Sequence, residues 1–413
     1  VYKRQEEARA AFERAIELDP ADPLPHLGLG LSKISAGDLE AGRADVEVAV
    51  GLGSNDALLR SYLGKAYFEE KRAPLDMQQF DIAKELDPND PTAFLYSGIA
   101  RQTENRPVEA ARDLEKSVEL NDNRAAYRGR LLLDKDRAAR GTSLARAYND
   151  MGFERLGINE STKSLTADPS NASAHRFLSD SYQNVRRREI SRVSELLQAQ
   201  MMQDINVNPV QPSVSSTNLN IVTAGGPASA GFNEFTPLFE RNKTQVNVSG
   251  FGGNNETRGG EGVVTGVYDN YSLSAGAFHY FTDGFRDNNK LRHKIYNLYG
   301  QAAVTPALNL QAEVRHRDST NGDIPMNFDP DDFAPNYERD FKETTARLGA
   351  RFSPSPSSNL LLSLIYSDRE EEQTDGSSTL VPIPFPPFSF TNSQSFAADT
   401  KEEAYQPEIQ YLH

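Results

Sequence analysis

The hydrophobic positions of the chain follow two different periods, one in each half. In residues 1–205 apolar residues recur at helical spacing, and a larger unit repeats every 34 residues, as Leu18, Leu52, Leu86 and Leu120 show. From residue 244 onward, segments of nine to twelve residues alternate between apolar and polar positions, as strands with two unlike faces do. The sequence therefore predicts a helical repeat domain followed by an antiparallel β domain.

Three further sets of positions share the 34-residue spacing. They are small residues (Ala15, Ala49, Ala83, Ser117), a bulky residue three positions before each (Phe12, Val46, Phe80, Leu114), and glycines (Gly30, Gly64, Gly98). Small residues let two helices approach closely, and the Asp-Pro segments end one repeat and start the next helix. This pattern resembles the tetratricopeptide (TPR) repeat, a helix–turn–helix unit whose copies stack into a superhelix with an inner groove.

The resemblance implies which residues line that groove. The period slips by 13 residues after Asn123 and then resumes, and the last pair of helices is closed by a capping helix over Val193–Met202. The groove positions that the family pattern assigns are Arg146, Asn149, Asp150, Arg176, Asp180, Gln183 and Asn184, with Leu27, Leu31, Ser61 and Lys65 in the earlier repeats. These residues either bind a protein or peptide, or are solvated polar residues on a scaffold.

The second half of the chain is predicted to consist of strands. Residues 6–203 form the repeat domain, 204–243 are a connector rich in Pro, Ser, Asn and Gly, and 244–413 form the β domain. The expected strands are Thr244–Gly252, Glu261–Tyr268, Tyr271–Phe281, Lys294–Val304, Leu308–Asp318, Lys342–Phe352, Asn359–Asp368 and Ala398–Leu412. About eight strands are thus present, and we expect further strands beyond residue 413.

The predicted strands have one apolar and one polar face. A two-residue turn at Asp269-Asn270 sets Tyr268 opposite Tyr271, and Gly266, Val264 and Gly262 opposite Leu273, Ala275 and Ala277. In the strands that follow, leucine, valine and alanine occupy one face. The opposite face carries Asn297, Gln301, Asn309, Gln311, Glu313, Arg315, Arg317, Arg347 and Arg351.

Three features favour a transmembrane β-barrel over a soluble sandwich, which would also alternate. Tyr268, Tyr271 and Phe352 lie beside the short turns, where an interfacial aromatic girdle would lie. Short and long connections alternate, as in outer-membrane barrels. The strands are long enough to cross a bilayer at a tilt, whereas sandwich strands average about five or six residues. In a barrel the polar face would line the lumen.

The combination of repeats and barrel resembles a group of bacterial outer-membrane proteins. FNEFTPLFERN, which leads into the first strand, resembles the barrel entry of uncharacterised members, and the architecture is similar to exopolysaccharide export porins. The resemblance implies an outer-membrane channel or export protein with periplasmic repeats. Its partners would be outer-membrane lipid, a periplasmic protein or peptide, and a polysaccharide or small solute. The alternative is a binding module anchored by a closed barrel without transport.

Composition and motifs narrow the chemistry. The 44 Lys+Arg residues and 59 Asp+Glu residues give a net charge of −15, which argues against nucleic acid as a partner. The chain has no cysteine, its six histidines show no metal-ligand spacing, and no phosphate loop or nucleophile elbow is present. We therefore expect no enzymatic activity, no catalytic residues, no metal and no cofactor.

Overall fold

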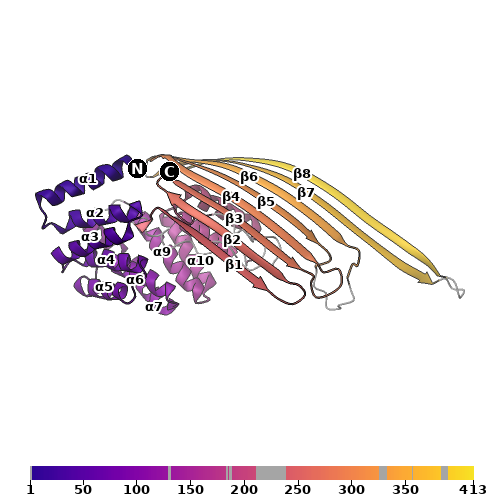
Figure 1. Cartoon of the computed structure of the whole chain (residues 1–413), viewed down its shortest axis with the longest axis horizontal. Helices are drawn as coiled ribbons and strands as arrows, with labels where there is room; N and C mark the ends of the chain where they lie inside the picture. The colour runs from indigo at the N-terminus through magenta and orange to yellow at the C-terminus, as the bar shows by residue number, and fades with distance from the viewer. Residues whose placement is uncertain are drawn as a thin grey trace.

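The computed structural model describes residues 2–128, 132–182, 185, 188–210, 239–324, 333–355, 357–382 and 389–413. Its helices stack in antiparallel pairs at one end of a long curved sheet, and the strands run away from the helices (Figure 1). The chain thus has the helical repeat half and the antiparallel β half that the two hydrophobic periods predict.

The helical half contains paired helices joined by short turns. The helices are α1 (Tyr2–Leu18), α2 (Pro23–Ala36), α3 (Leu39–Leu52), α4 (Ala57–Glu69), α5 (Leu75–Leu86), α6 (Pro91–Thr103), α7 (Pro107–Glu119), α8 (Arg124–Arg128), α9 (Leu133–Asp150), α10 (Glu154–Ala167), α11 (Ala172–Tyr182) and α12 (Glu189–Met202). The pairs are α2 with α3, α4 with α5, α6 with α7, α9 with α10 and α11 with α12. The short α8 occupies the place where the sequence period slips. Within the described part of the chain, no helix combines the length and apolar character needed to cross a membrane.

The 34-residue spacing has a direct structural cause. Asp22, Asp56 and Asp90 each cap the first helix of a pair, accepting a hydrogen bond from the backbone N–H two residues later at 2.8–3.0 Å. Each repeat also has a close helix contact at its glycine. A Cβ atom on Gly64 would lie 2.6 Å from the ring of Phe80, and one on Gly98 would lie 2.7 Å from Leu114. The predicted glycine and bulky positions are therefore partners across the two helices of one pair.

The β half is one sheet of eight strands. The strands are β1 (Lys243–Gly252), β2 (Arg258–Tyr268), β3 (Tyr271–Thr282), β4 (Leu291–Thr305), β5 (Leu308–Asn321), β6 (Glu338–Ser355), β7 (Ser358–Pro382) and β8 (Ser389–Leu412). Every strand pairs antiparallel with the next, in the order β1 to β8. The eight predicted strands are all present, and the Tyr268–Tyr271 register is confirmed, as are the pairs Gly266–Leu273 and Val264–Ala275.

Two sequence expectations about the sheet need correction. The strands expected to form a closed barrel make an open sheet, with β1 and β8 at opposite edges (Figure 1). Strands β7 and β8 also extend to 25 and 24 residues, well past the predicted Asp368 and back before the predicted Ala398. The predicted bounds left residues 369–397 outside both strands, so β7 ends later and β8 begins earlier than the alternation indicated.

The two faces of the sheet are separated as predicted, but with the opposite burial to an ordinary soluble sheet. Strand β4 alternates regularly: Leu298 is 58% exposed, whereas Asn297 is 4% and Gln301 is 3% exposed. Leu273 on β3 is 59% exposed as well. The apolar face is therefore open, and the mostly polar face is covered. A small apolar cluster that includes Phe278 and Ile295 interrupts the covered face.

Candidate functional site

The covered face of the sheet carries α12 and the segment that follows it. The Gln311 side chain donates a hydrogen bond to the Gln200 carbonyl at 2.6 Å, and the Gln301 side chain donates to the Gln203 carbonyl at 3.1 Å. Farther along, Ser272 donates to the carbonyl of Asn206 at 2.9 Å. Polar side chains of the sheet thus satisfy the backbone carbonyls at the end of α12, which have no partner within the helix. The predicted capping helix closes the repeats and also joins them to the sheet.

Glu313 on β5 is the centre of this contact. Its carboxylate accepts hydrogen bonds from Asn297 at 2.8 Å and from Gln200 of α12 at 3.1 Å. The guanidinium of Arg347 on β6 forms an ion pair with it at 3.4 Å, and also donates to Gln311 at 3.2 Å. Because these groups are nearly shielded from solvent, each depends on its partners to offset the cost of desolvation.

The residues predicted to face a lumen all lie on this covered side of the sheet. Asn297, Gln301, Asn309, Gln311, Glu313, Arg317 and Arg347 are buried, and Arg315 and Arg351 are half-buried. Arg351 donates to the carbonyl of Met202 and forms an ion pair with Asp204 at 3.0 Å. A cavity of about 830 Å³ remains between α12 and strands β5 to β8, beside Glu313, Arg315 and Arg347. The structure therefore places α12 where the prediction placed an open lumen.

The described groove positions predicted on the later repeats lie on α9 and α11, in different surroundings. Arg176 is buried and forms an ion pair with Asp180, one turn away, at 3.0 Å. Asp150 is exposed and accepts a hydrogen bond from Gln102 at 2.6 Å. Asn149 is exposed and Arg146 is half-buried. The predicted Gln183 and Asn184 lie outside the described residues.

The earlier repeats have an occupied groove. Phe239, from the end of the connector, is completely buried among residues of α4 and α6. Its ring stacks on Tyr62 at 6.2 Å between centroids and meets the edge of Tyr96 at 6.4 Å. The ammonium group of Lys65, one of the predicted groove residues, lies 5.5 Å from the centre of the same ring. The groove predicted for an external peptide is filled here by the chain itself.

Charged groups surround the docked ring. Arg241 forms an ion pair with Glu69 at 2.7 Å, and Lys65 forms one with Glu69 at 2.5 Å. Burial lowers the pKa of Lys65 because the charged amine loses its hydration. Burial alone would raise the pKa of Glu69, but the charges and hydrogen bonds of Lys65 and Arg241 outweigh it and hold that pKa below its ordinary value. Glu69 is thus kept ionised between two cations.

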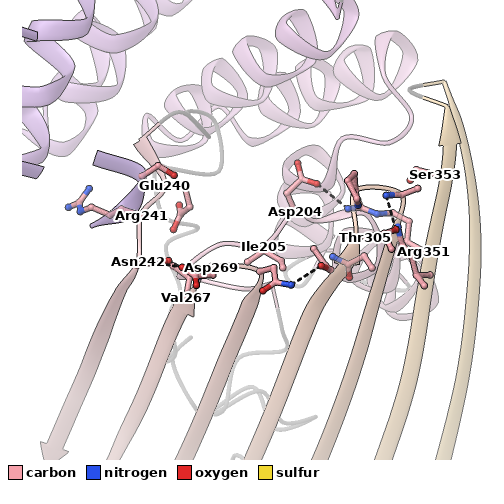
Figure 2. Close-up of a pocket in the computed structure, with 17 residues that line it drawn as sticks. Asp204, Ile205, Glu240, Arg241, Asn242, Val267, Asp269, Thr305, Arg351 and Ser353 are labelled. Atoms are coloured by element: carbon pink, nitrogen blue, oxygen red, sulfur yellow. Dashed lines mark hydrogen bonds and ion pairs between the residues drawn. The ribbon is translucent and has the colours of Figure 1, made fainter. Parts of the chain in front are cut away.

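The same connector residues meet the short turns of the sheet. Asn242 donates from its side chain to Asp269 at 2.7 Å, and the Asp269 backbone N–H donates back to the Asn242 side chain at 2.7 Å. Figure 2 shows these residues around a cavity of about 290 Å³, with Asp204 and Arg351 on another side. The short turns at Asp269 and Thr305 therefore face the helical repeats.

One acidic cluster among the described residues has the spacing of a metal site. Carboxylate oxygens of Glu370, Glu372 and Asp399 lie within 4.8 Å of one another on β7 and β8. Lys401 already forms an ion pair with Glu370 at 2.5 Å, and two of the three acids are exposed. A lysine partner and exposure to solvent therefore account for the cluster without a bound ion.

Sequence reasoning did not identify the two contacts that join the halves of the molecule. It treated Phe239 and Arg241 as part of the barrel entry and α12 as a cap alone. A signal was present in each case. Phe239 is an aromatic residue between a polar connector and a charged Glu-Arg pair, and the end of α12 combines Gln200 and Gln203 with two methionines, a polar and apolar mixture suited to a polar sheet face.

No known protein family matches the chain, and no curated protein matches it. Solved structures do resemble part of it. A chain of the Cut9–Hcn1 hetero-tetramer of the APC/C is 16% identical, with a TM-score of 0.43. The match covers 49% of this chain and 37% of that chain, so this chain spans little more than a third of that chain's length. YrrB, described as a TPR protein with an unusual peptide-binding site, is 20% identical (TM-score 0.34; 48% and 94% covered). PilF of Pseudomonas aeruginosa is 16% identical (TM-score 0.37; 49% and 80% covered).

The repeat geometry defines the class of the helical half. Its paired helices, 34-residue spacing and glycine contacts make it a TPR-like solenoid. In the described residues this solenoid is followed by an open antiparallel sheet of eight strands.

Proposed function

We propose that the chain is a protein-binding scaffold of the bacterial outer membrane, in which the sheet anchors the protein in lipid and the repeats bind a periplasmic protein or peptide. The observation that carries this proposal is the inverted burial of the sheet. Leucine, valine and tyrosine side chains cover its open face, and amides, carboxylates and guanidinium groups cover its shielded face.

Burying apolar surface is worth roughly 25 cal/mol per Å², so a soluble sheet places its apolar face inside. Here a helix with its own polar contacts covers the polar face, and the apolar face stays open from β1 to β8. Exposed apolar patches of this extent are typical of interfaces with lipid or protein. Tyr268 and Tyr271 also lie exposed beside a short turn, where the aromatic residues of a membrane anchor meet the lipid head groups.

The edges of the sheet set a condition for this proposal. Unpaired backbone N–H and C=O groups are not tolerated in lipid, so the edges β1 and β8 must pair with each other or with additional strands in the membrane. The short turns and the repeats lie at the same end of the sheet. In an outer-membrane protein the short turns are periplasmic, which would put the repeats in the periplasm.

Liposome flotation tests the anchor. The full chain, purified in detergent and diluted into liposomes, should float with the lipid in a density gradient and resist extraction at alkaline pH. A protein that remains monomeric and soluble in buffer without detergent, and that stays at the bottom of the gradient, would contradict the proposal. A soluble sheet carried on the repeats, with no contact to lipid, would then be the better interpretation.

Transport is the second candidate. The cavity of about 830 Å³ beside α12 has Glu313, Arg315 and Arg347 on its wall, and these charges support a pathway for a polysaccharide or small solute. The hydrogen bonds that hold α12 on the same face favour a closed state and hence the anchor without flux. Planar-bilayer recordings separate the two. Steady ion conductance by the inserted full chain would support a channel or export outlet, and its absence in inserted protein would support the anchor.

A further inference from the structure

The pocket that holds Phe239 belongs to the groove side of the repeats. Tyr62 and Lys65 come from α4, and Tyr96 comes from α6, which are the first helices of two successive pairs. These three side chains are between 1% and 5% exposed with Phe239 in place. Phe239 contributes one aromatic ring to a site that otherwise has two tyrosines and an ammonium group around it.

The second contact is a charge pair two residues further on. The Arg241 guanidinium reaches Glu69 at the end of α4, at 2.7 Å, and both side chains are largely shielded from solvent. Glu69 simultaneously binds Lys65, which lies under the phenylalanine ring. The aromatic contact and the ionic contact are therefore coupled through Lys65. The pocket binds a phenylalanine and an arginine that are two positions apart in the sequence.

Backbone contacts set the direction of the bound segment. The Asn242 N–H donates to the carbonyl of Ser35 at the end of α2, at 3.4 Å. The Glu240 carboxylate accepts a hydrogen bond from the backbone N–H of Val207 at 2.9 Å, so this side chain points toward the segment after α12. Phe239 and Arg241 face the repeats, and the Glu240 side chain between them faces the segment after α12.

We infer that α4 and α6 form a binding site for short peptide segments of the pattern Phe-x-Arg, and that Phe239–Arg241 is its ligand within the chain. Such a site releases its internal ligand when a partner carrying the same pattern competes for it. Release would also separate the start of β1 from the repeats, because Asn242 is adjacent to β1. This inference rests on the binding role proposed for the repeats and names the peptide chemistry that they recognise, and it does not depend on whether the sheet enters a membrane.

The chain contains no tryptophan, which provides a specific probe of the pocket. In a full-length Phe239→Trp variant the single indole reports whether the segment is docked. We expect blue-shifted emission in the free protein. Titration with the octapeptide TPLFERNK, residues 236–243, should move the emission to the red in a saturable manner. An internal ligand benefits from an effective concentration that reaches the millimolar range, so the peptide is supplied to millimolar concentrations.

A direct binding experiment complements this competition. The full-length double variant Phe239→Ala/Arg241→Ala leaves the pocket without its internal ligand, and fluorescence anisotropy should detect binding of labelled TPLFERNK. The unaltered chain should bind the same peptide at least about tenfold more weakly, because its pocket is filled. Adding Glu69→Gln to the double variant should weaken binding at least about tenfold through loss of the arginine partner.

The peptide TPLAEANK is the matched control, since it lacks the two recognised side chains. Circular dichroism tests whether the double variant retains its helices. If the double variant does not fold, the Phe239→Trp variant provides the second readout. The inference is overturned if the folded double variant does not bind TPLFERNK, or if TPLAEANK binds equally well. It is also overturned if the emission of Phe239→Trp already matches that of an exposed indole without peptide.

Discussion

The two halves of the molecule differ in where their apolar residues lie. The repeats bury them, and the sheet exposes them on one face. In the repeats, the bulky residue of each pair is inaccessible, as Phe80 and Leu114 are, whereas charged residues such as Glu13 and Arg14 face the solvent. In the sheet, Leu298 and Leu273 face outward while Glu313 and Arg347 are buried. The lipid contact that we propose would cover the open face of the sheet, whereas water surrounds the repeats.

The contacts between the halves follow from this difference. A polar sheet face cannot be covered by an ordinary apolar helix without leaving its amides and charges unsatisfied. The end of α12 meets this need with glutamine side chains and with carbonyl groups that its own helix does not use. The last helix of the repeats, α12, therefore packs against both the neighbouring helix α11 and the polar face of the sheet.

The largest effect is expected from charge on the open face of the sheet. The double substitution Leu298→Arg/Val314→Arg should abolish flotation with liposomes. These two exposed residues pair across β4 and β5, four residues along from the level of Tyr271, and an arginine facing lipid near the bilayer centre costs about 2–4 kcal/mol. At about 1.4 kcal/mol per tenfold change, each substitution lowers the insertion equilibrium by roughly 30-fold or more. The measurement is the fraction of the full chain that floats.

Val48→Arg provides the control, because Val48 is an exposed apolar residue on helix α3 of the repeats. Substitutions at exposed positions in water usually change stability by less than about 0.5 kcal/mol. Val48→Arg should float like the unaltered chain. If the double substitution in the sheet leaves flotation unchanged as well, the open face does not contact lipid. The difference between the two halves would then not reflect a membrane environment.

The next largest effect is expected on the shielded face. Glu313→Ala removes the carboxylate that Asn297, Gln200 and Arg347 share. Breaking a buried ion pair by removing one partner costs about 3–5 kcal/mol, so α12 should separate more readily from the sheet. Hydrogen exchange of the α12 backbone amides, followed by mass spectrometry, measures this opening.

Glu13→Ala is the matched change in the exposed pair Arg9–Glu13 of α1. Exposed pairs contribute about 0.2–1 kcal/mol, so exchange in α12 should be unaltered. Unchanged protection of α12 in Glu313→Ala would mean that the sheet does not hold this helix through the buried carboxylate.

Much of this fold is predictable because its signals are periodic and local. Glycines and bulky residues 34 positions apart identify the helix pairs, and strict alternation fixes both faces of strands such as β4. The register of β2 on β3 follows from the two-residue turn at Asp269. Each of these inferences uses residues that lie close together in the sequence.

The interactions that the sequence did not predict join distant parts of the chain. Phe239 contacts Tyr62 across 177 positions, and Gln200 contacts Glu313 across 113. Nothing in a local pattern indicates which groove an isolated aromatic residue enters. Closure of the sheet is likewise a property of its two edges, which alternation along single strands does not determine.

A smaller effect should separate two glycines of the repeats. Gly64→Ala places a methyl group 2.6 Å from the Phe80 ring and 3.0 Å from the Asp76 carbonyl, so it should destabilise the repeats by about 1–3 kcal/mol. Gly51, near the end of α3, has no atom within 4 Å of an added Cβ. Gly51→Ala should stabilise by about 0.5–1 kcal/mol. Urea unfolding followed by far-UV circular dichroism measures both, and equal effects would refute the close helix contact.

The smallest effect is expected from a change of pH. The pKa of Glu69 is lowered and the pKa of Glu240 is raised, so the two carboxylates change the stability in opposite directions as the pH changes. The pKa of Glu69 lies below 4.5 in the folded state, as the charges of Lys65 and Arg241 outweigh burial, so its stabilisation is complete above pH 4.5 and is lost as the pH falls through the folded pKa. Burial raises the pKa of Glu240 above 4.5, so the folded state is favoured when this group is protonated and loses that advantage as the pH rises. Emission of the Phe239→Trp chain in a pH titration measures the balance.

Single substitutions distinguish the two carboxylates. Glu69→Gln should reduce docking of the segment at neutral pH, and its difference from the unaltered pocket should shrink in acid, where Glu69 becomes protonated. Glu240→Gln should strengthen docking at neutral pH, because it keeps an oxygen for the Val207 N–H and removes a buried charge. In acid, where Glu240 becomes protonated, docking in Glu240→Gln should approach that of the chain with Glu240, this time from a higher value. If both substitutions shift docking in the same direction at neutral pH, the two groups do not have opposed pKa shifts, and the pocket selects arginine for a reason other than the charge of Glu69.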